Sequence, residues 1–390
     1  MAIGIIAEYN PFHNGHAYQI AEIKKIFPDA EIIAVMSGSF TQRGNSAILD
    51  KWTRARLAVE NGVDLVLELP FIYAVRSAQD FARGGVNLLA NLGVVDTLAF
   101  GAEIFDIKKL KLAAATFDDK NFAEKLKLEM ASGESYAAAV TKILSAVSQI
   151  DIGKPNTILA IEYLRALPKN ITPLLIPRGK IISSATAIRN ELYKKSVAWE
   201  KISVPPNILT ELQAAELPNE DFLFRPLLTK ILTSKLDDFK KIYGMNEGIE
   251  FKLIESARTA KNFGELVGGI VNKRFPTSRV KRLLLHFLLN VTAETFLNVG
   301  DYARVLAFNE RGKFLLKQIR TASKIPIITK VAQHLNSKEI LFGKIIEPYK
   351  KNLALDLLAT DLRETLFEPP KNLRKDFFVC PEKSRNFNQV

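Results

Sequence analysis

The sequence predicts an α/β fold with a parallel sheet, followed by a mostly α-helical second domain. Over the first 190 residues, short aliphatic and β-branched runs alternate with longer stretches of helical periodicity, a pattern typical of a parallel sheet with crossover helices. Beyond residue 207, apolar residues recur mainly at helical spacing. The chain has 390 residues, and domains hold roughly 150 residues each. We therefore expect two domains, residues 1–200 and 201–390.

The expected elements follow one another in chain order. Strands are expected at 3–9, 31–37, 63–69, 94–101 and 171–177, and helices at 16–27, 50–62, 77–93, 108–117 and 156–167. The two prolines of VPPN, residues 204–207, break any continuing helix and place the domain boundary near residues 195–207. In the second domain, helices are expected at 278–291, 304–319 and 353–367.

Composition excludes several classes of protein. Hydrophobic residues make up 47% and charged residues of mixed sign 25%, as in a globular protein. No run reaches the roughly 18 apolar residues that span a bilayer, and the N-terminal run, interrupted by Glu8, reads as a buried strand rather than a signal peptide. The single cysteine, Cys380, has no partner for a disulfide or a zinc site. We expect a cytoplasmic protein with no membrane segment.

Positive charge is concentrated in the second half of the chain. Residues 201–390 hold 31 Lys and Arg against 21 Asp and Glu, a net of +10, whereas residues 1–200 hold 23 against 21. A basic domain beside a nearly neutral one indicates an anionic macromolecule that the basic part binds through phosphate contacts. A basic surface that serves only solubility is the alternative interpretation.

A histidine-containing turn gives the strongest functional signal. EYNPFHNGH, Glu8 to His16, lies between the first expected strand and the first expected helix, where ligands of open parallel sheets bind. His13 and His16 are three residues apart, so at a helix start they face the same way, and Gly15 lets a phosphate approach the backbone. Imidazole donors there would stabilise charge that develops on a phosphate.

Two other interpretations of the histidine pair are a structural pair and half of a metal site. No acidic residue or cysteine accompanies the pair at ligand spacing. The glycine and the expected strand, turn and helix around it favour a nucleotide. We therefore expect no metal site in the chain.

A second motif places hydroxyl groups before a helix. Residues 181–190, IISSATAIRN, put Ser183, Ser184 and Thr186 at an expected helix start, with Arg189 in the first turns. Hydroxyls and free amides at a helix N-terminus suit an anion, and Arg189 would bridge the β- and γ-phosphates of a nucleotide. Ordinary N-capping by serine is the alternative for this motif alone. Its combination with the histidine turn favours a phosphate site.

Together the two motifs resemble those of the nucleotidyltransferase superfamily. HNGH is similar to the HxGH signature, and ISSATAIR is similar to the ISSTxIR motif. More narrowly, GIIAEYNPFHNGH, MSGSFTQRG, DLVLELPF, FGAE and KPNTILAIEYL resemble, in this order, segments of the bacterial tRNA(Met) cytidine acetate ligase family. The resemblance covers nearly the whole first domain and implies a Rossmann-like nucleotidyltransferase fold for it.

The resemblance also implies a reaction. ATP would activate acetate as acetyl-adenylate, and the acetyl group would pass to N4 of the wobble cytidine of elongator tRNA(Met), with Mg²⁺ carried by the ATP. The implied catalytic residues are His13, His16 and Arg189. The implied ATP site is formed by Ala7, Glu8, Tyr9, Asn10, Pro11, Phe12, His13, Asn14, Gly15, His16, Ala17, Tyr18, Gln19, Ile20, Gly101, Asn156, Arg178, Ser183, Ser184 and Thr186.

Two other functions compete with this one. An adenylyltransferase for a small phosphorylated metabolite would not need a basic helical domain. A non-catalytic RNA-binding protein would not need both phosphate motifs intact. These features favour the ligase over either alternative.

Basic residues cluster in the second domain, in the segment NKRFPTSRVKRLLLHF. This segment resembles the family's TSxRIxR region, which implies that it binds tRNA, and physically it would follow a phosphate backbone while Phe275 stacks on a base. The solvated face of an amphipathic helix is the alternative. His286, on the apolar side of the same helix, is expected in the core. The basic residues are Lys273, Arg274, Arg279, Lys281 and Arg282.

A glycine-containing loop follows the expected strand at 31–37. Ser37, Gly38 and the segment Gln42–Gly44 lie at the strand end where a substrate loop is expected. Arg43 is accordingly a candidate contact for acetate or for tRNA phosphate. A glycine-rich surface turn is the alternative.

Two residues at the start of the helix expected at 50–62 have separate expected roles, and the sequence departs from the family pattern at two places. Lys51 opens the helix as a candidate phosphate contact, and Trp52 is expected in the core. Asn45 stands where the family commonly has Glu, and only the four residues 179–182 separate Arg178 from the serine motif, where the family commonly has a longer segment.

Overall fold

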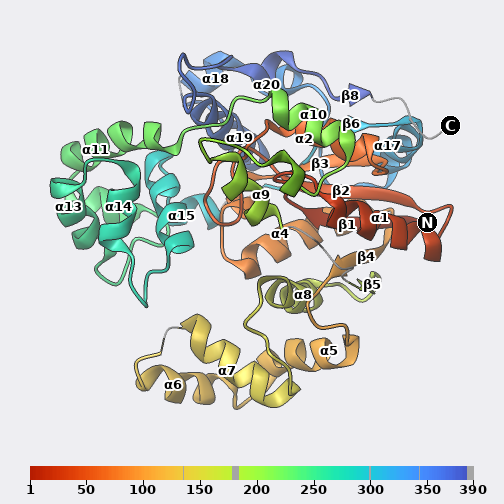
Figure 1. Ribbon diagram of the computed structural model, residues 1–390, viewed down its shortest axis with the longest axis horizontal. Helices are drawn as coiled ribbons and strands as arrows, with labels where there is room; N and C mark the ends of the chain where they lie inside the picture. Colours follow the sequence, from red (N-terminus) through yellow and green to blue (C-terminus); the bar gives the residue numbers. More distant parts are fainter. Residues whose placement is uncertain (135, 178–183, 298–299, 342, 384–390) are drawn as a thin grey trace.

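A single mixed sheet organises the computed structural model, which describes residues 1–390 except 135, 178–183, 298–299, 342 and 384–390 (Figure 1). Within the described residues the strand order is β5-β4-β1-β2-β3-β6-β7, with β8 beside β6. The strands are β1 (Ala2–Ala7), β2 (Glu31–Ser37), β3 (Leu65–Leu69), β4 (Val95–Gly101), β5 (Thr172–Ile176), β6 (Ala303–Phe308), β7 (Ile327–Ile328) and β8 (Glu382–Lys383).

The first five strands are parallel and are covered on both faces, which confirms the predicted α/β class. Alternation along β2 shows the two faces: Ile32 and Ala34 belong to one core cluster, whereas Ile33 and Val35 belong to the other. A strand buried on both sides is nearly all apolar because it has no face toward water. The sheet is therefore the middle layer of three.

Helices from residues 14–214 cover these two faces. One face is covered by α1 (Asn14–Ile26), α2 (Lys51–Glu60), α9 (Ala185–Leu192) and α10 (Pro206–Ala214), and the other by α3 (Phe71–Ala74), α4 (Ala78–Asn91) and α8 (Pro155–Ala166). Between β4 and α8 the chain forms α5 (Ile107–Ala115), α6 (Phe122–Ala131) and α7 (Tyr136–Ser148), which lie together at the lower edge of Figure 1.

The sheet crosses the predicted boundary at residue 200. β6 pairs antiparallel with β3. The helix expected at residues 304–319 is therefore wrong in its first part, because residues 304–308 belong to this strand. The run ARVLAF is short, apolar and mostly buried, and periodicity alone does not distinguish such a run from a buried helix. The helix begins only after Asn309, whose side chain accepts a hydrogen bond from the backbone N–H of Gly312 at 2.9 Å. The division into domains at residue 200 stays a prediction.

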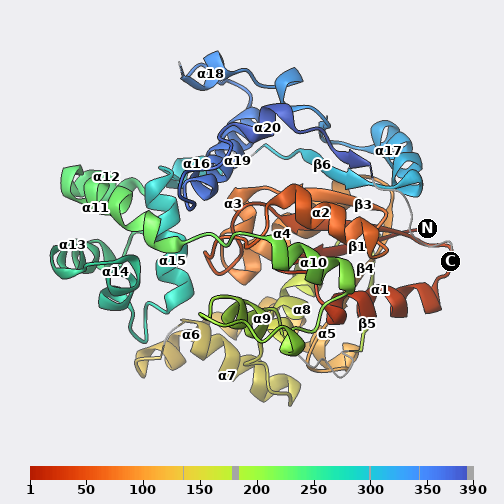
Figure 2. The ribbon, with the colours of Figure 1, turned by 45° about the horizontal axis from the view of Figure 1, so that its top comes forward.

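Helices dominate the rest of the second half. α11 (Phe224–Thr233), α12 (Leu236–Lys241), α13 (Ile249–Thr259), α14 (Phe263–Ile270) and α15 (Thr277–Leu288) form a helical body beside the sheet (Figures 1 and 2). The remaining helices are α16 (Ala293–Leu297), α17 (Glu310–Ala322), α18 (Ser337–Leu341), α19 (Pro348–Glu364) and α20 (Lys375–Phe378). Among the described residues, none of the helices combines the length and the apolar character that crossing a membrane requires.

Candidate functional site

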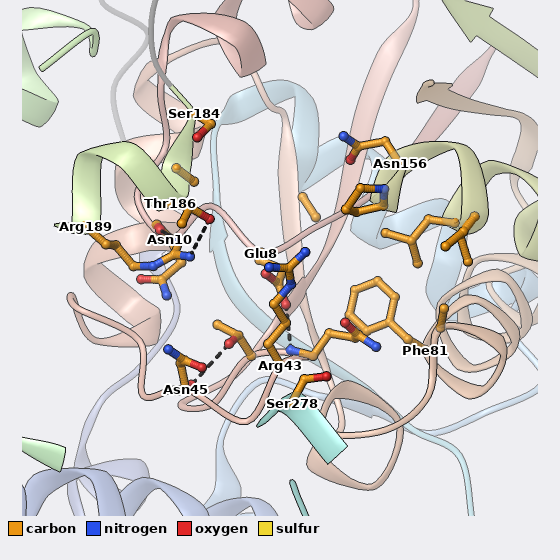
Figure 3. A pocket seen from close by; sticks show the side chains of 18 of the residues that line it. Glu8, Asn10, Arg43, Asn45, Phe81, Asn156, Ser184, Thr186, Arg189 and Ser278 are labelled. Atoms are coloured by element: carbon orange, nitrogen blue, oxygen red, sulfur yellow. Dashed lines mark hydrogen bonds between the residues drawn. The ribbon is translucent and has the colours of Figure 1, made fainter. Parts of the chain in front are cut away.

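A large cavity lies beyond the carboxyl ends of β1, β4 and β5. Its volume is about 2040 Å³, more than the roughly 300–1,000 Å³ of an ordinary small-molecule pocket. Both halves of the chain contribute to its wall, and Figure 3 shows side chains converging on it from several elements. The lining residues come from Phe117 and from the ranges 6–19, 41–48, 77–81, 100–103, 136–163, 176–177, 184–193, 217–221 and 263–282.

The turn between β1 and α1 is fixed by its own side chains. Tyr9 adopts a left-handed backbone conformation with φ of 45°, which is uncommon for a residue other than glycine and recurs at functional sites. Tyr9 and Phe12 are both about 1% exposed, with ring centroids 5.0 Å apart. The side-chain oxygen of Asn10 accepts a hydrogen bond from the backbone N–H of Ile48 at 2.9 Å. The turn is therefore anchored on its core side while its other side faces the cavity.

His13 and His16 form a reciprocal cap at the start of α1. Nδ1 of His13 accepts from the N–H of Gly15 at 3.0 Å, and Nδ1 of His16 accepts from the N–H of His13 at 3.1 Å. The rings stack with centroids 3.8 Å apart, so they face the same way, as the spacing predicted. An Nδ1 that accepts carries no proton, so in each neutral ring the proton is on Nε2.

This arrangement suits an anion. Two Nε2–H donors and the N-terminal end of α1 combine hydrogen bonds with the positive end of a helix dipole. Because the backbone holds both rings, the donors need little reorganisation when charge develops on a phosphate. The site therefore favours stabilisation of a phosphoryl group without a covalent intermediate.

The predicted stretch from Ala7 to Ile20 divides into two sets. Nine of its residues line the cavity: Ala7, Glu8, Tyr9, Asn10, His13, Gly15, His16, Tyr18 and Gln19. The other five, Pro11, Phe12, Asn14, Ala17 and Ile20, are not part of its lining. Phe12 and Ile20 belong to the core, and the Asn14 side chain donates to Ser203 Oγ at 2.9 Å. A continuous sequence motif covers both sides of a helix, and only one of these sides faces the cavity.

Arg189 of α9 approaches the same turn. Its Nη1 donates to the carbonyl of Asn10 at 2.6 Å, and its Nη2 donates to Thr186 Oγ1 at 3.1 Å (Figure 3). Burial lowers the pKa of the guanidinium, and the Glu8 carboxylate partly offsets that effect. Ser184 lines the cavity and also accepts from Ala187 N–H as the N-cap of α9, so capping and a place in the site occur together.

An acidic residue that the sequence reasoning missed orients Asn156. Glu103 accepts from the Asn156 side chain at 2.7 Å and from Thr157, through its backbone N–H at 2.7 Å and its hydroxyl at 2.9 Å. Burial alone would raise the pKa of Glu103, but these hydrogen bonds outweigh it and lower the pKa. Gly101 and Asn156, both predicted, line the cavity with Glu103. The signal was present in FGAE, where the glutamate follows Gly101 by two residues.

Glu8 and Arg43 both line the cavity and are drawn near its middle in Figure 3. Glu8 Oε1 accepts from the backbone N–H of Gln42 at 2.6 Å. Burial raises the pKa of Glu8, while that hydrogen bond and the positive charges of Arg189, Arg54 and Arg43 act in the opposite direction. Arg43 is exposed to the cavity, so the glycine-containing loop is more than a surface turn.

Three expectations lie outside the described residues: Arg178, Ser183 and the short segment 179–182. Asn45, the other departure from the family pattern, lines the cavity, and its carbonyl accepts from Thr41. Within the described residues, no group of three or more His, Cys, Asp or Glu side chains is arranged to hold a metal ion.

The predicted basic cluster divides between surface and interior contacts. Lys273 and Arg274 are exposed, whereas Lys281 pairs with Glu220 at 2.7 Å and Arg282 donates to the Gln42 carbonyl at 3.0 Å. Arg279 lies 3.4 Å from a Glu247 carboxylate oxygen. The two most C-terminal cations thus hold parts of the protein together.

Two expectations about single side chains are wrong. Phe275, expected to stack on a base, precedes α15 and is 2% exposed in the core, so its ring is not available for stacking. Lys51, expected at a phosphate, is fully buried between Glu68 and Asp376, with Nζ 2.8 Å from each carboxylate. His286 and Trp52 are core residues, as predicted.

The fold and the cavity define a nucleotidyltransferase. The chain matches the model of the family described as HIGH Nucleotidyl Transferase over residues 1–376. A tRNA(Met) cytidine acetate ligase from Halothermothrix orenii is 34% identical over 97% of this chain and 98% of its own length. One from Caldanaerobacter subterraneus subsp. tengcongensis is 36% identical over the same two shares. The chain therefore belongs to the tRNA(Met) cytidine acetate ligase family.

Solved structures agree with this assignment. The crystal structure of Thermotoga maritima TmcAL bound with alpha-thio ATP superimposes with a TM-score of 0.89 at 31% identity, over 99% of this chain and 100% of that one. The apo form of the same protein gives a TM-score of 0.88. The similarity covers the helical body as well as the sheet.

Proposed function

We propose that the protein is an ATP-dependent tRNA(Met) cytidine acetate ligase. The observation that carries the proposal is the pair of imidazoles held by backbone hydrogen bonds at the start of α1, inside a cavity walled by both halves of the chain. Relatives that align over nearly the whole chain are named as such ligases, and a similar structure holds an ATP analogue.

In the first step, a carboxylate oxygen of acetate attacks the α-phosphorus of ATP, the bond to pyrophosphate breaks, and acetyl-adenylate forms. His13 and His16 donate through Nε2 to the phosphate oxygens that gain charge, and Arg189 neutralises the departing pyrophosphate. Asn156, oriented by Glu103, binds the adenosine through its amide. Mg²⁺ carried by the triphosphate would supply further electrostatic stabilisation of the phosphate charge.

In the second step, N4 of the cytidine attacks the acetyl carbonyl, a C–N bond forms, AMP leaves and N4 loses a proton. The base has to leave its stack to reach the strand ends. The cavity exceeds the volume of one small-molecule pocket, which supports room for a nucleotide beside the adenylate. Exposed Lys273 and Arg274 would contact tRNA phosphates. We place the reaction in the cytoplasm, where tRNA and ATP occur together.

The test uses purified protein with ATP, Mg²⁺, labelled acetate and an unmodified elongator tRNA(Met) transcript, each omitted in turn. We expect acetate-dependent pyrophosphate release and label in tRNA as N4-acetylcytidine. A transcript with uridine at the wobble position is the matched control and should stay unlabelled. Pyrophosphate released only with a phosphorylated metabolite would instead establish an adenylyltransferase, and tight tRNA binding without either product would establish a binding protein.

A further inference from the structure

A short hairpin carries Arg43 into the cavity. We call residues 39–48 the Arg43 hairpin. Phe40 and Ser46 pair as an antiparallel bridge, and at the tip the N–H of Thr41 donates to the carbonyl of Asn45 at 2.9 Å. An isolated two-stranded hairpin is at best marginally stable in water. The position of Arg43 therefore depends on what holds the hairpin from outside.

Arg363 of α19 holds one end of it. Its Nε donates to the carbonyl of Ala47 at 2.8 Å and its Nη2 to the carbonyl of Ile48 at 3.1 Å. Its Nη1 donates to Glu364 at 2.6 Å, and the side chain is 4% exposed. A planar guanidinium reaches two successive carbonyls at once, whereas a lysine ammonium is a single point with no such fork.

Arg54 of α2 holds the chain on both sides of the hairpin. Its Nε donates to the carbonyl of Leu49 at 3.1 Å, and its Nη1 donates to the carbonyl of Ser37 at 3.0 Å. The same Nη1 donates to the carbonyl of Glu8 at 2.6 Å, so it links the hairpin base to the β1–α1 turn. Arg54 is 1% exposed. Two buried arginines thus bind backbone carbonyls at both ends of one short segment.

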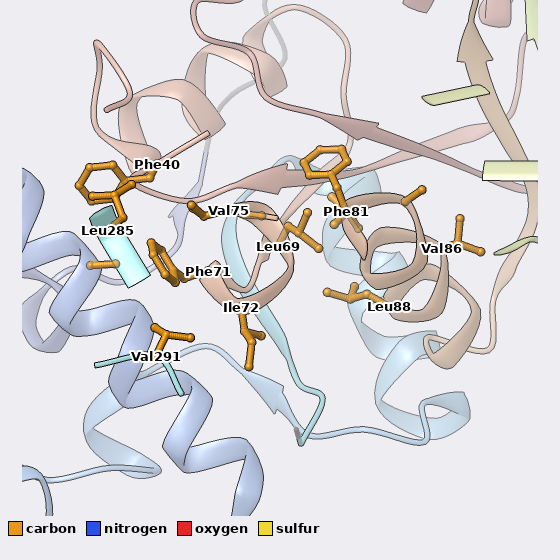
Figure 4. Close-up of a cluster of buried hydrophobic side chains, with 14 of the residues drawn as sticks. Phe40, Leu69, Phe71, Ile72, Val75, Phe81, Val86, Leu88, Leu285 and Val291 are labelled. Carbon is orange, nitrogen blue, oxygen red and sulfur yellow. The ribbon is translucent and has the colours of Figure 1, made fainter. Parts of the chain in front are cut away.

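The hairpin is also packed from below and at its tip. The rings of Phe40 and Phe71 meet edge to face with centroids 6.2 Å apart (Figure 4). Ser39 Oγ donates to Thr360 Oγ1 of α19 at 3.1 Å. At the tip, a side chain on Gly44 would meet the backbone of α15, with its Cβ 2.7 Å from the N of Arg282. The Arg43 side chain projects from the hairpin into the cavity, whose wall also includes Gln42 and Asn45 (Figure 3).

We propose that Arg363, which lies outside the cavity lining, is a positioning residue: by binding the carbonyls of Ala47 and Ile48 it sets the Arg43 guanidinium where it meets the anionic substrate. The inference rests on the proposed function for the identity of that substrate, the carboxylate of acetate in the first step. The hydrogen bonds to the hairpin are independent of that identity. Arg43 contacts substrate, and Arg363 acts only through it.

A double-mutant cycle tests this mechanism. Arg363→Lys keeps the positive charge but cannot donate to the carbonyls of Ala47 and Ile48 in the same two-pronged geometry. Arg43→Ala removes the guanidinium that Arg363 is proposed to position. We expect Arg363→Lys to lower kcat by about tenfold or more and to leave the Kd for ATP within about twofold. In the Arg43→Ala background the same substitution should lower kcat no further, because the effects of substituting residues that act as one unit are not additive. Arg320→Lys, on the exposed face of α17, is the matched control.

Hydrogen–deuterium exchange gives a second readout that does not depend on catalysis. Amides of residues 39–50 should exchange faster in Arg363→Lys, while amides of α1 should not. Effects that add in the double mutant, full activity of Arg43→Ala, or unchanged exchange in residues 39–50 would each overturn the proposal. If Arg363→Lys does not fold, Thr360→Val, which removes the hydroxyl that Ser39 contacts, replaces it in the double-mutant cycle. We expect a smaller loss of kcat from this variant. If the wild type makes no acetylcytidine, the ligase function fails, and the exchange data still decide whether Arg363 holds the hairpin.

Discussion

The histidine turn and the Arg43 hairpin reach the same cavity by opposite means. The imidazoles of the turn are held by neighbouring backbone: His13 and His16 accept from N–H groups no more than three residues away. The hairpin is held by Arg54, Arg282 and Arg363, which come from α2, α15 and α19. One wall of the cavity is therefore local in sequence, and the other is assembled by the fold.

Because of this difference, the two sides of the cavity should respond differently to substitutions at distant residues. A change at a distant residue should leave the two imidazoles in place unless it alters a residue that contacts the turn, such as Arg54 or Arg189. A change at Arg363, which is not part of the cavity lining, should move Arg43 without altering the lining itself. Substitutions in one wall or the other distinguish the two, and the largest effect is expected at the histidines.

Substitution of the histidines should have the largest effect. His16→Ala removes one Nε2 donor, and we expect kcat to fall by a factor on the order of 10² to 10³, as for a lost oxyanion-hole donor. His13→Asn should lose a similar factor while preserving the melting temperature, since asparagine also caps a helix. The measurements are acetate-dependent pyrophosphate release and thermal unfolding. A wild-type rate in either variant would contradict the role assigned to the turn.

Gly44→Ala should break the hairpin rather than the turn. Gly44 has φ of 75°, and its added Cβ would press on the backbone of Arg282. We expect a loss of stability of about 1–3 kcal/mol and about a tenfold loss of kcat. Gly248→Ala is the matched control, with φ of 78° and no atom within 4 Å of the added Cβ. Equal activity losses in the two variants would show that backbone strain alone, and not contact with α15, is responsible.

Acid should destabilise the packing beneath the hairpin through His286. Its Nε2 lies 2.9 Å from the carbonyl of Val75, and burial, together with the positive charges of Arg76 and Arg282, lowers its pKa to about 4. The folded pKa lies below the unfolded value of about 6.5, so the unfolded state binds the proton first, and stability falls as the pH drops from about 6.5 toward 4. Between pH 7 and 5 this contribution is about 2 kcal/mol.

The measurement is the free energy of unfolding at pH 7 and pH 5 in the wild type and in His286→Phe. The variant should lose less stability between the two pH values, whatever its absolute stability. An identical pH dependence in both proteins would mean that other groups account for the acid sensitivity.

The smallest effect is expected at the surface. Lys273→Ala should weaken tRNA binding a few fold and reduce the slope of log K against log salt by about one, because one phosphate contact is lost. Lys281→Met should leave that slope unchanged, since its charge is paired with Glu220. Filter binding across a salt series measures both. A reduced slope for Lys281→Met would show that the Glu220 pair opens when tRNA binds.

The parallel sheet, the histidine turn with its helix, and the place of Gly101 at the end of a strand could be predicted from the sequence alone, whereas Asn156 was implied by the family resemblance. These features depend on periodicity and on contacts within a few residues, which a sequence displays directly. The alternation of apolar residues in β2 and the capping by His13 are of this kind.

Three features could be seen only in the folded structure: the antiparallel pairing of β6 with β3, the burial of Phe275 and Lys51, and the hydrogen bonds from Arg363 to the Arg43 hairpin. Each depends on a partner distant in sequence: β6 on the free edge of β3, Lys51 on Asp376, and the hairpin on α19. A buried charge and a surface charge have the same local sequence, because desolvation and pairing are properties of the folded neighbourhood rather than of the residue.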